Sequence, residues 1–219
     1  MREQTQAEYA SSSITRNLHA EATSVRAGGW QVGLGVDVNG KTLGLLGLGK
    51  IGQAVARMGQ AFGMRTIAWS QNLTAEVAAE HGVERVDKDQ LFRDADVLSV
   101  HLKLGERTCG IVGERELALM KPSAYLVNTS RGPIVSEPAL IEALQARRIA
   151  GAALDVFDEE PLAPGHPYRF LPTCWRPRIL ATSPKTLTAP PIHRLSKRSG
   201  PGLTMRRSAN CRARGEAVI

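Results

Sequence analysis

The sequence predicts an α/β protein built on a doubly wound parallel sheet of six strands. Short apolar runs alternate with segments of helical periodicity between residues 42 and 157. A glycine-rich turn joins the first apolar run to the first of these helices. Hydrophobic residues make up 42% of the chain, which is ordinary for a globular protein. Together these observations favour a sheet covered by helices on both faces.

The six strands are expected where apolar runs are bounded by turn residues. They are 42–49 (TLGLLGLG, ending in the glycine turn), 64–70, 83–86, 96–102, 124–130 and 150–157. Crossover helices are expected between them at 53–62, 74–82, 88–95, 114–121 and 137–148. Pro122 ends the fourth helix, and Pro138 stands in the first turn of the fifth, where proline is tolerated. This alternation predicts the strand order 3-2-1-4-5-6.

The segment ahead of the sheet is expected to contain one leading helix. Ile14, Leu18 and Val25 have spacings that fit one helical face, and Gly28–Gly29 is a typical helix stop. Residues 1–13 are polar, and we expect them to be disordered. They contain no apolar core of the kind found in secretory signals, so a cytoplasmic location is expected.

The net charge of +7 lies entirely in the C-terminal segment. Residues 183–219 contain eight Lys or Arg residues and one Glu, and they follow a short apolar run at 179–181 that predicts a strand. We expect this basic tail to be unstructured because it has no apolar period. Basic arms can bind phosphate backbones, but the tail has no folded motif, so nucleic-acid binding ranks last among the functions considered.

The turn GLGKIG predicts a dinucleotide site for NAD or NADP. Gly47, Gly49 and Gly52 have the G-x-G-x-x-G spacing, with Lys50 and Ile51 between them. The first glycine permits the tight turn, the second lets the backbone approach a pyrophosphate, and the third lets the helix pack on the strand. The pattern alone is weak, but here it follows an expected strand and opens an expected helix.

The second strand does not end in the acid that usually holds the ribose 2′-hydroxyl. Ser70 stands at that place, followed by Gln71 and Asn72. An acid would repel a 2′-phosphate, whereas serine would not, and no arginine stands beside it to bind that phosphate. The choice between NAD and NADP therefore stays open.

Two further motifs, VNTSRGPIV (127–135) and ALDVFDEEPL (153–162), complete a resemblance. With GLGKIG, they resemble the D-isomer-specific 2-hydroxyacid dehydrogenases of the phosphoglycerate dehydrogenase and glyoxylate/hydroxypyruvate reductase type. The resemblance covers about residues 14–182. It implies a Rossmann domain that binds NAD(P), hydride transfer between the cofactor and a 2-hydroxy or 2-keto acid, and a homodimer. No membrane partner and no metal are expected.

The resemblance also implies roles for particular residues. Arg131 matches the arginine that binds the substrate carboxylate, and it is expected near the cofactor as well. Glu160 matches the glutamate that orients the catalytic histidine. Asp155 matches the acid that holds the nicotinamide carboxamide, and His101 and Thr129 match positions that line the cofactor.

The catalytic histidine of the family has no match in this sequence. In the family, the strand after the EEP loop leads into Thr-Pro-His, whereas this chain continues as RILATSPKTL (178–187). His166 lies too early and His193 too late, and Lys185 is the substitute that the sequence offers. The abrupt change of composition after residue 182 is what a shifted reading frame would produce, and we hold this as a hypothesis that the DNA would test.

The sequence thus predicts three segments. They are a disordered N-terminus at 1–13, a dinucleotide-binding domain with its leading helix at 14–182, and a basic tail at 183–219. Because only about forty residues precede the first strand, the substrate domain of the family is expected to be largely missing. Two readings stay open: a truncated and catalytically impaired dehydrogenase, and a non-catalytic NAD(P)-binding module.

Overall fold

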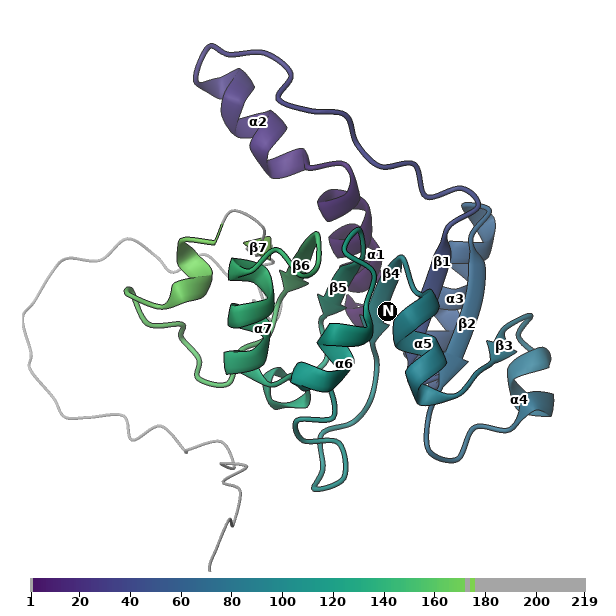
Figure 1. The fold of residues 1–219 in the computed structure, drawn as a ribbon. Coiled ribbons are helices and arrows are strands. Elements are labelled where there is room, and N and C mark those ends of the chain that lie inside the picture. Colours follow the sequence, from purple (N-terminus) through teal and green to yellow (C-terminus); the bar gives the residue numbers. More distant parts are fainter. Residues whose placement is uncertain (1, 172–173, 176–219) are drawn as a thin grey trace, which may run out of the picture. The chain divides into compact units, whose positions relative to one another are not determined.

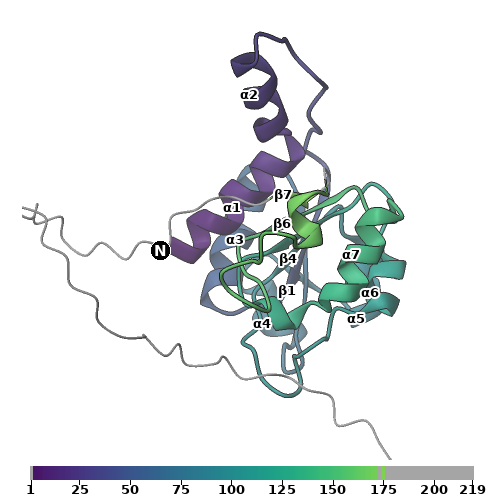
Figure 2. The same cartoon turned by 90° about the vertical axis from the view of Figure 1, so that its left-hand side faces the viewer.

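In the computed structural model, the described residues 2–171 and 174–175 form a parallel sheet with helices on both faces (Figures 1 and 2). The strands are β1 (Thr42–Leu46), β2 (Arg65–Trp69), β3 (Glu84–Arg85), β4 (Val97–Val100), β5 (Tyr125–Asn128), β6 (Gly151–Leu154) and β7 (Cys174–Trp175). The helices are α1 (Arg2–Thr15), α2 (Leu18–Arg26), α3 (Lys50–Ala61), α4 (Ala75–Ala79), α5 (Lys88–Asp94), α6 (Glu114–Leu119) and α7 (Glu137–Gln145), with short 3-10 turns η1 (Gly132–Ile134) and η2 (Pro167–Arg169).

The sheet confirms the predicted doubly wound order and adds a seventh strand. The strands lie in the order β3-β2-β1-β4-β5-β6-β7, and every pairing is parallel. The added strand, β7, pairs Cys174 with Ala152 and Trp175 with Ala153 of β6. The strand expected at 179–181 and the basic tail at 183–219 lie outside the described residues.

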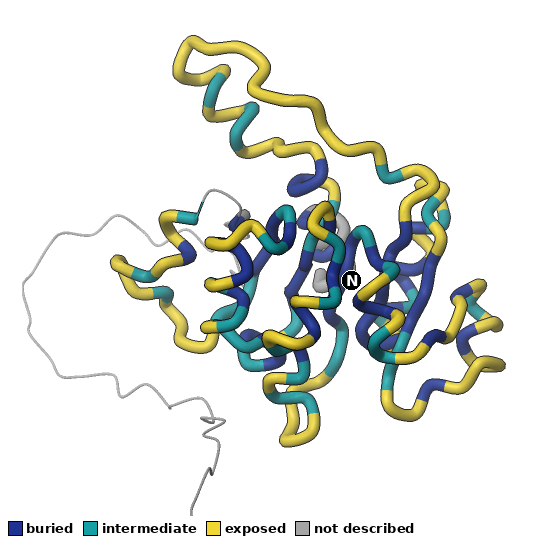
Figure 3. Tube along the Cα trace, viewed as in Figure 1, coloured by how far each residue is buried: buried dark blue, intermediate teal, exposed yellow. Residues whose placement is uncertain are grey.

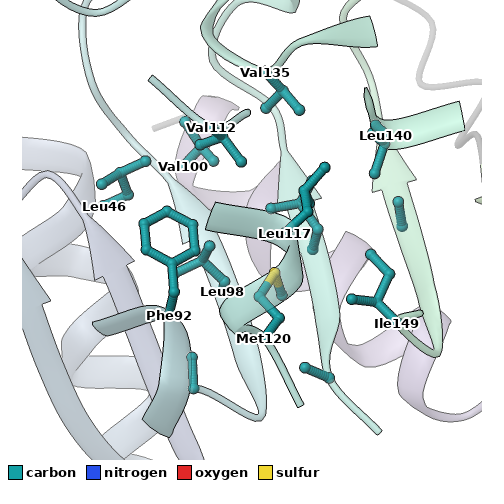
Figure 4. Close-up of a cluster of buried hydrophobic side chains, with 14 of the residues drawn as sticks. Leu46, Phe92, Leu98, Val100, Val112, Leu117, Met120, Val135, Leu140 and Ile149 are labelled. Carbon is teal, nitrogen blue, oxygen red and sulfur yellow. The ribbon is translucent and has the colours of Figure 1, made fainter. Parts of the chain in front are cut away.

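Successive residues of the buried strands face opposite layers of helices. Leu43 and Leu45 of β1 belong to a cluster with α1 and α3, whereas Leu46 belongs to a cluster with α5, α6 and α7. The second cluster is drawn in Figure 4, where Phe92 and Leu117 project from their helices onto the strands. This two-sided burial explains why the strands are continuous apolar runs and not alternating ones.

The expectation that residues 1–13 are disordered does not agree with the structure, in which Arg2–Thr15 form α1. Ala7, Ala10, Ser13 and Ile14 are buried, and the helix lies against α3, β5 and β6. The spacing of these residues is helical, but alanine and serine carry little hydrophobic signal. The buried face was therefore underestimated from the sequence.

The leading helix is also divided in two. Asn17, with a positive φ of 51°, separates α1 from α2, and α2 buries none of its residues. Leu18 and Val25, expected on a packed face, are 46% and 56% exposed. Figure 3 shows α2 and the segment after it as largely exposed, and this segment includes Trp30 and Leu34.

Asp96 ties together the beginnings of two central strands. Its Oδ2 accepts a hydrogen bond from the Thr42 N–H at 2.8 Å, and its Oδ1 lies 2.9 Å from Lys121 Nζ. Burial alone would raise the pKa of Asp96, but the Thr42 N–H and Lys121 outweigh it and hold that pKa below its ordinary value. The hydrogen bond from Thr42 thus joins the beginnings of β1 and β4, and the ion pair ties them to Lys121, ahead of β5.

No helix in the part of the chain that the structure describes combines the length and apolarity that a bilayer span requires.

Candidate cofactor site

The glycine turn closes tightly between the ends of three strands. Gly47 has a φ of +107°, which favours glycine, and its N–H donates to the Trp69 carbonyl at the end of β2 (2.9 Å). The His101 N–H, just after β4, donates to the Leu46 carbonyl at the end of β1 (2.9 Å). A Cβ on Gly52 would lie 2.3 Å from the Gly47 carbonyl oxygen, so only glycine lets α3 begin this close to the turn.

The second glycine of the motif faces open space. A Cβ on Gly49 would have no protein atom within 4 Å, and Gly49 is the N-cap of the twelve-residue helix α3. The unpaired N–H groups and the positive end of the helix dipole are therefore accessible at this point. A ligand with a phosphate group can approach the backbone here without displacing a side chain.

A cavity of about 670 Å³ lies above this turn. Its lining comes from three segments that follow β1, β4 and β5: Gly49, Lys50, Ile51, His101, Leu102, Lys103, Leu104, Ser130 and Arg131. The cavity lies where the strand order reverses between β1 and β4, which is where open parallel sheets bind ligands. Three of its lining residues are cations and none is an acid, so the cavity suits an anionic ligand.

The wall formed by the segment after β5 is held by hydrogen bonds. The Asn128 side chain donates to the Arg131 carbonyl (3.0 Å) and accepts from the Ser130 N–H (3.1 Å). The Ser130 hydroxyl donates to the Leu102 carbonyl (2.7 Å), which joins this turn to the segment after β4. The Arg131 side chain is exposed at the cavity, and its Nη1 donates to the Ser130 carbonyl.

His101 contributes a buried polar atom to the cavity. Its Nε2 is buried without a hydrogen-bond partner among the described residues. Burial lowers the pKa of His101 to about 4, so the imidazole is neutral at pH 7. A neutral imidazole can donate or accept one hydrogen bond at Nε2, and it cannot act as a general acid in the way an imidazolium does.

The structure does not place every predicted site residue at this cavity. Gly49, Lys50, Ile51, His101 and Arg131 line it, and Gly47 and Gly52 shape the turn beneath it. Ser70, Thr129, Asp155 and Glu160 are not among its lining residues. Four lining residues were not predicted, and their only signal was their place just after the ends of β4 and β5: Leu102, Lys103, Leu104 and Ser130.

Asp155 and Glu160 lie in the loop that follows β6. The Asp155 N–H donates to the Asn128 carbonyl (3.1 Å), so this loop begins beside the Arg131 turn. Glu160 Oε1 accepts from the Phe157 N–H (3.1 Å). Burial and, to a lesser degree, the charge of Glu160 raise the pKa of Asp155 to about 6.

Comparisons with known proteins agree with this geometry. Residues 10–182 match the family model "D-isomer specific 2-hydroxyacid dehydrogenase, NAD binding domain". A glyoxylate reductase from Aeropyrum pernix is 53% identical over 134 residues, which are 61% of this chain and 40% of that protein. A D-3-phosphoglycerate dehydrogenase from Methanocaldococcus jannaschii is 43% identical over 149 residues, or 67% of this chain and 28% of that protein.

Solved structures show the same similarity. A phosphoglycerate oxidoreductase from Vibrio cholerae superimposes with a TM-score of 0.76 at 38% identity, covering 80% of this chain and 57% of that one. An NAD-complexed 2-hydroxyacid dehydrogenase from Lactobacillus delbrueckii gives a TM-score of 0.69 at 28% identity, covering 80% and 58%. The chain spans less than half the length of the two curated relatives named above. This chain belongs to the D-isomer-specific 2-hydroxyacid dehydrogenase family, and the part that matches is the NAD-binding domain.

Proposed function

We propose that this chain binds NAD(H) or NADP(H) in the cavity at the ends of β1, β4 and β5, as the nucleotide-binding part of an oxidoreductase for 2-hydroxy or 2-keto acids. One observation carries the proposal: the N-terminus of α3 opens at Gly49 into a cavity that contains cations and no acid. The residues fit a dinucleotide, because the turn leaves space where a pyrophosphate would approach the backbone. The bound cofactor would supply the hydride.

In this proposal, the chain's own residues bind and orient the reactants. Lys50 and the N–H groups at the start of α3 hold the pyrophosphate, and Asp155 accepts from the nicotinamide carboxamide. Arg131 offers a planar pair of donors to a carboxylate, the group shared by all 2-keto acids. Ser70 neither attracts nor repels a 2′-phosphate strongly, so both cofactors are accepted.

A second candidate function, a non-catalytic NAD(P)-binding module, is favoured by the histidines. Reduction of a keto group needs a proton donor. His101 is neutral at pH 7, and His166 is engaged by Glu137 and by the Tyr168 N–H. Neither is placed as the donor, and no other histidine matches the catalytic one of the family.

The two functions are separated by measuring binding and turnover on the same sample. NADH and NADPH fluorescence titrations of the purified 219-residue chain test the site itself. Oxidation of bound NAD(P)H in the presence of glyoxylate or hydroxypyruvate tests the chemistry. Binding with turnover supports the dehydrogenase, and binding without turnover supports the module. No binding of either cofactor refutes both.

We further propose that the chain forms a homodimer. Trp30 and Leu34 are 82% and 91% exposed, and Phe62 on α3 is 57% exposed. An apolar cavity of about 390 Å³ includes Val36 and Phe62 in its lining. Surfaces of this kind are usually covered by a partner. Light scattering after gel filtration is expected to give twice the monomer mass for the parent chain. For Leu34→Glu it is expected to give the mass of one monomer.

Two expectations about the cellular setting stay predictions. A cytoplasmic location is tested by fractionation. Absence of nucleic-acid binding is tested by a gel shift at physiological salt, because the basic residues at 183–219 would bind phosphate backbones only electrostatically.

A further inference from the structure

A histidine outside the cavity makes two directed contacts. His166 Nε2 lies 3.0 Å from Glu137 Oε1, and His166 Nδ1 accepts from the Tyr168 N–H at 3.3 Å. Because Nδ1 accepts, the neutral ring carries its proton on Nε2 and donates it to Glu137. Both side chains are mostly buried, at 16% and 24% exposure. One tautomer therefore satisfies both contacts and joins η2 to the first turn of α7.

This pair is connected to the loop that carries Asp155 and Glu160 through two aromatic rings. The Tyr168 ring is 5.0 Å from the His166 ring and 6.2 Å from the Phe157 ring. Tyr168 is only 3% exposed, and Phe157 packs against the same core cluster. Since the Phe157 N–H donates to Glu160, the position of Phe157 also sets the position of that carboxylate.

The opposite side of the loop touches the turn that carries Arg131. A Cβ on Gly132 would lie 2.3 Å from the Phe157 carbonyl carbon and 2.7 Å from the Asp158 nitrogen. The two backbones are therefore in direct contact. Gly132, Glu137, Phe157, Asp158 and Tyr168 enclose a space of only about 10 Å³, no larger than one water needs. The loop is thus held between η1 on one side and the His166–Glu137 pair on the other.

The helix that carries Glu137, α7, is packed in the hydrophobic core. Leu140, Ala143 and Leu144 of α7 are buried in the core. Loops that follow parallel strands are usually the mobile parts of such folds. A hydrogen bond from the segment that follows the loop to a packed helix restricts that motion, because the helix cannot move without opening the core.

We propose that His166 and Glu137 are positioning residues that hold the loop of residues 155–160, and with it the carboxylates of Asp155 and Glu160, against the Arg131 turn. The inference rests on the proposed cofactor function, since it assigns these carboxylates to that site. It adds two residues that do not line the cavity and that lie 29 positions apart in the sequence.

The test separates the two contacts of His166. His166→Asn keeps an acceptor for the Tyr168 N–H and loses the donor to Glu137, whereas His166→Gln keeps a donor at the position of Nε2. His166→Ala loses both. The control is Glu116→Gln, which weakens a contact of similar length and burial, the ion pair of Lys88 Nζ with Glu116 Oε1 at 2.9 Å between α5 and α6.

Three quantities are measured for each variant: the melting temperature, the Kd for NADH and the titration of the Asp155 carboxyl by carbon NMR. His166→Ala is expected to move the pKa of Asp155 from about 6 toward its ordinary value. It is also expected to raise the Kd for NADH about 2- to 10-fold, as for one lost hydrogen bond. His166→Asn and His166→Gln should fall between it and the parent, and Glu116→Gln should change only the melting temperature.

The proposal is overturned if the His166 variants lower the melting temperature as the control does but leave the Asp155 titration at its parent value. That result would make the pair merely structural. Should the parent chain not bind NADH at all, the proposed function fails, and the Asp155 titration still decides on the positioning role. Should His166→Ala not fold, His166→Asn and His166→Gln give the same decision.

Discussion

Adding one methyl group at Gly49 separates the stability of the fold from the binding of the cofactor. A Cβ at this position meets no protein atom within 4 Å, and the φ of −78° suits any L-residue. Alanine is a poorer N-cap than glycine, but it also lowers the entropy of the unfolded chain. These effects oppose each other, so we expect the melting temperature to change by less than about 3 °C.

The same methyl group should strongly weaken the binding of NADH. It occupies the space through which a pyrophosphate must approach the N–H groups at the start of α3. A hydrogen bond to a charged group contributes about 1.5–3 kcal/mol, so losing one raises the Kd roughly 10- to 100-fold. The assay is a fluorescence titration with NADH, with the melting temperature recorded on the same preparation.

Gly33→Ala is the matched control for this variant. A Cβ on Gly33 also meets no atom within 4 Å, and Gly33 does not line the cavity. We expect both the melting temperature and the Kd to stay at parent values. If Gly49→Ala folds normally and binds NADH as well as the parent does, the pyrophosphate does not lie at this turn and the reasoning is wrong.

Four further predictions concern the site and the strands around it. The chain should reduce glyoxylate and hydroxypyruvate at a negligible rate, and Lys185→Ala should match its parent; a robust parent rate lost in this variant would make Lys185 the donor. Burial raises the pKa of Asp155 to about 6, so between about pH 4 and 6 the folded state binds more protons than the unfolded state. The stability therefore falls as the pH rises through this range. Asp155→Asn should raise the melting temperature at pH 7.5 and not at pH 3.5. The ionised Asp96 carboxylate stabilises the fold, because the pKa of Asp96 is lowered in the folded state. Asp96→Asn should therefore destabilise the chain at pH 7, and this effect should disappear as the pH falls below about 4. Gly132→Ala should cost about 1–3 kcal/mol in unfolding free energy, because its Cβ would collide with the Phe157 backbone, and an unchanged denaturation midpoint would contradict that contact.

The strands and their order could be predicted because their signals are local. Each central strand is a short apolar run, and parallel strands joined by helices leave few arrangements. The helix α1 was missed because Ala7 and Ala10 bury completely but have little hydrophobicity of their own. Leu18 and Val25 fit one helical face but are exposed, because periodicity shows that a face exists and not what covers it.

In the candidate site, too, the residues with a local sequence signal could be predicted and the others could not. Gly47, Gly49 and Gly52 could be found because the glycine turn uses six consecutive residues. Lys103 could not be found from the sequence. It lies after β4, about fifty residues from the glycine turn, and only the pairing of β1 with β4 brings the two segments together. The contact between His166 and Glu137 depends on where η2 docks on α7, which is a property of the whole fold.

This difference between local and distant signals bears on what the chain can do. Cofactor binding needs the glycine turn and the ends of neighbouring strands, all within the described part of the chain. Proton transfer needs a donor, and the residue at the place of the family's Thr-Pro-His motif is Lys185, which lies outside the described part of the chain. The ordinary pKa of a lysine is about 10.4, which is too high for an efficient general acid near neutral pH. Binding can therefore persist where turnover does not, and a measured NADH affinity would be no evidence of activity in this chain.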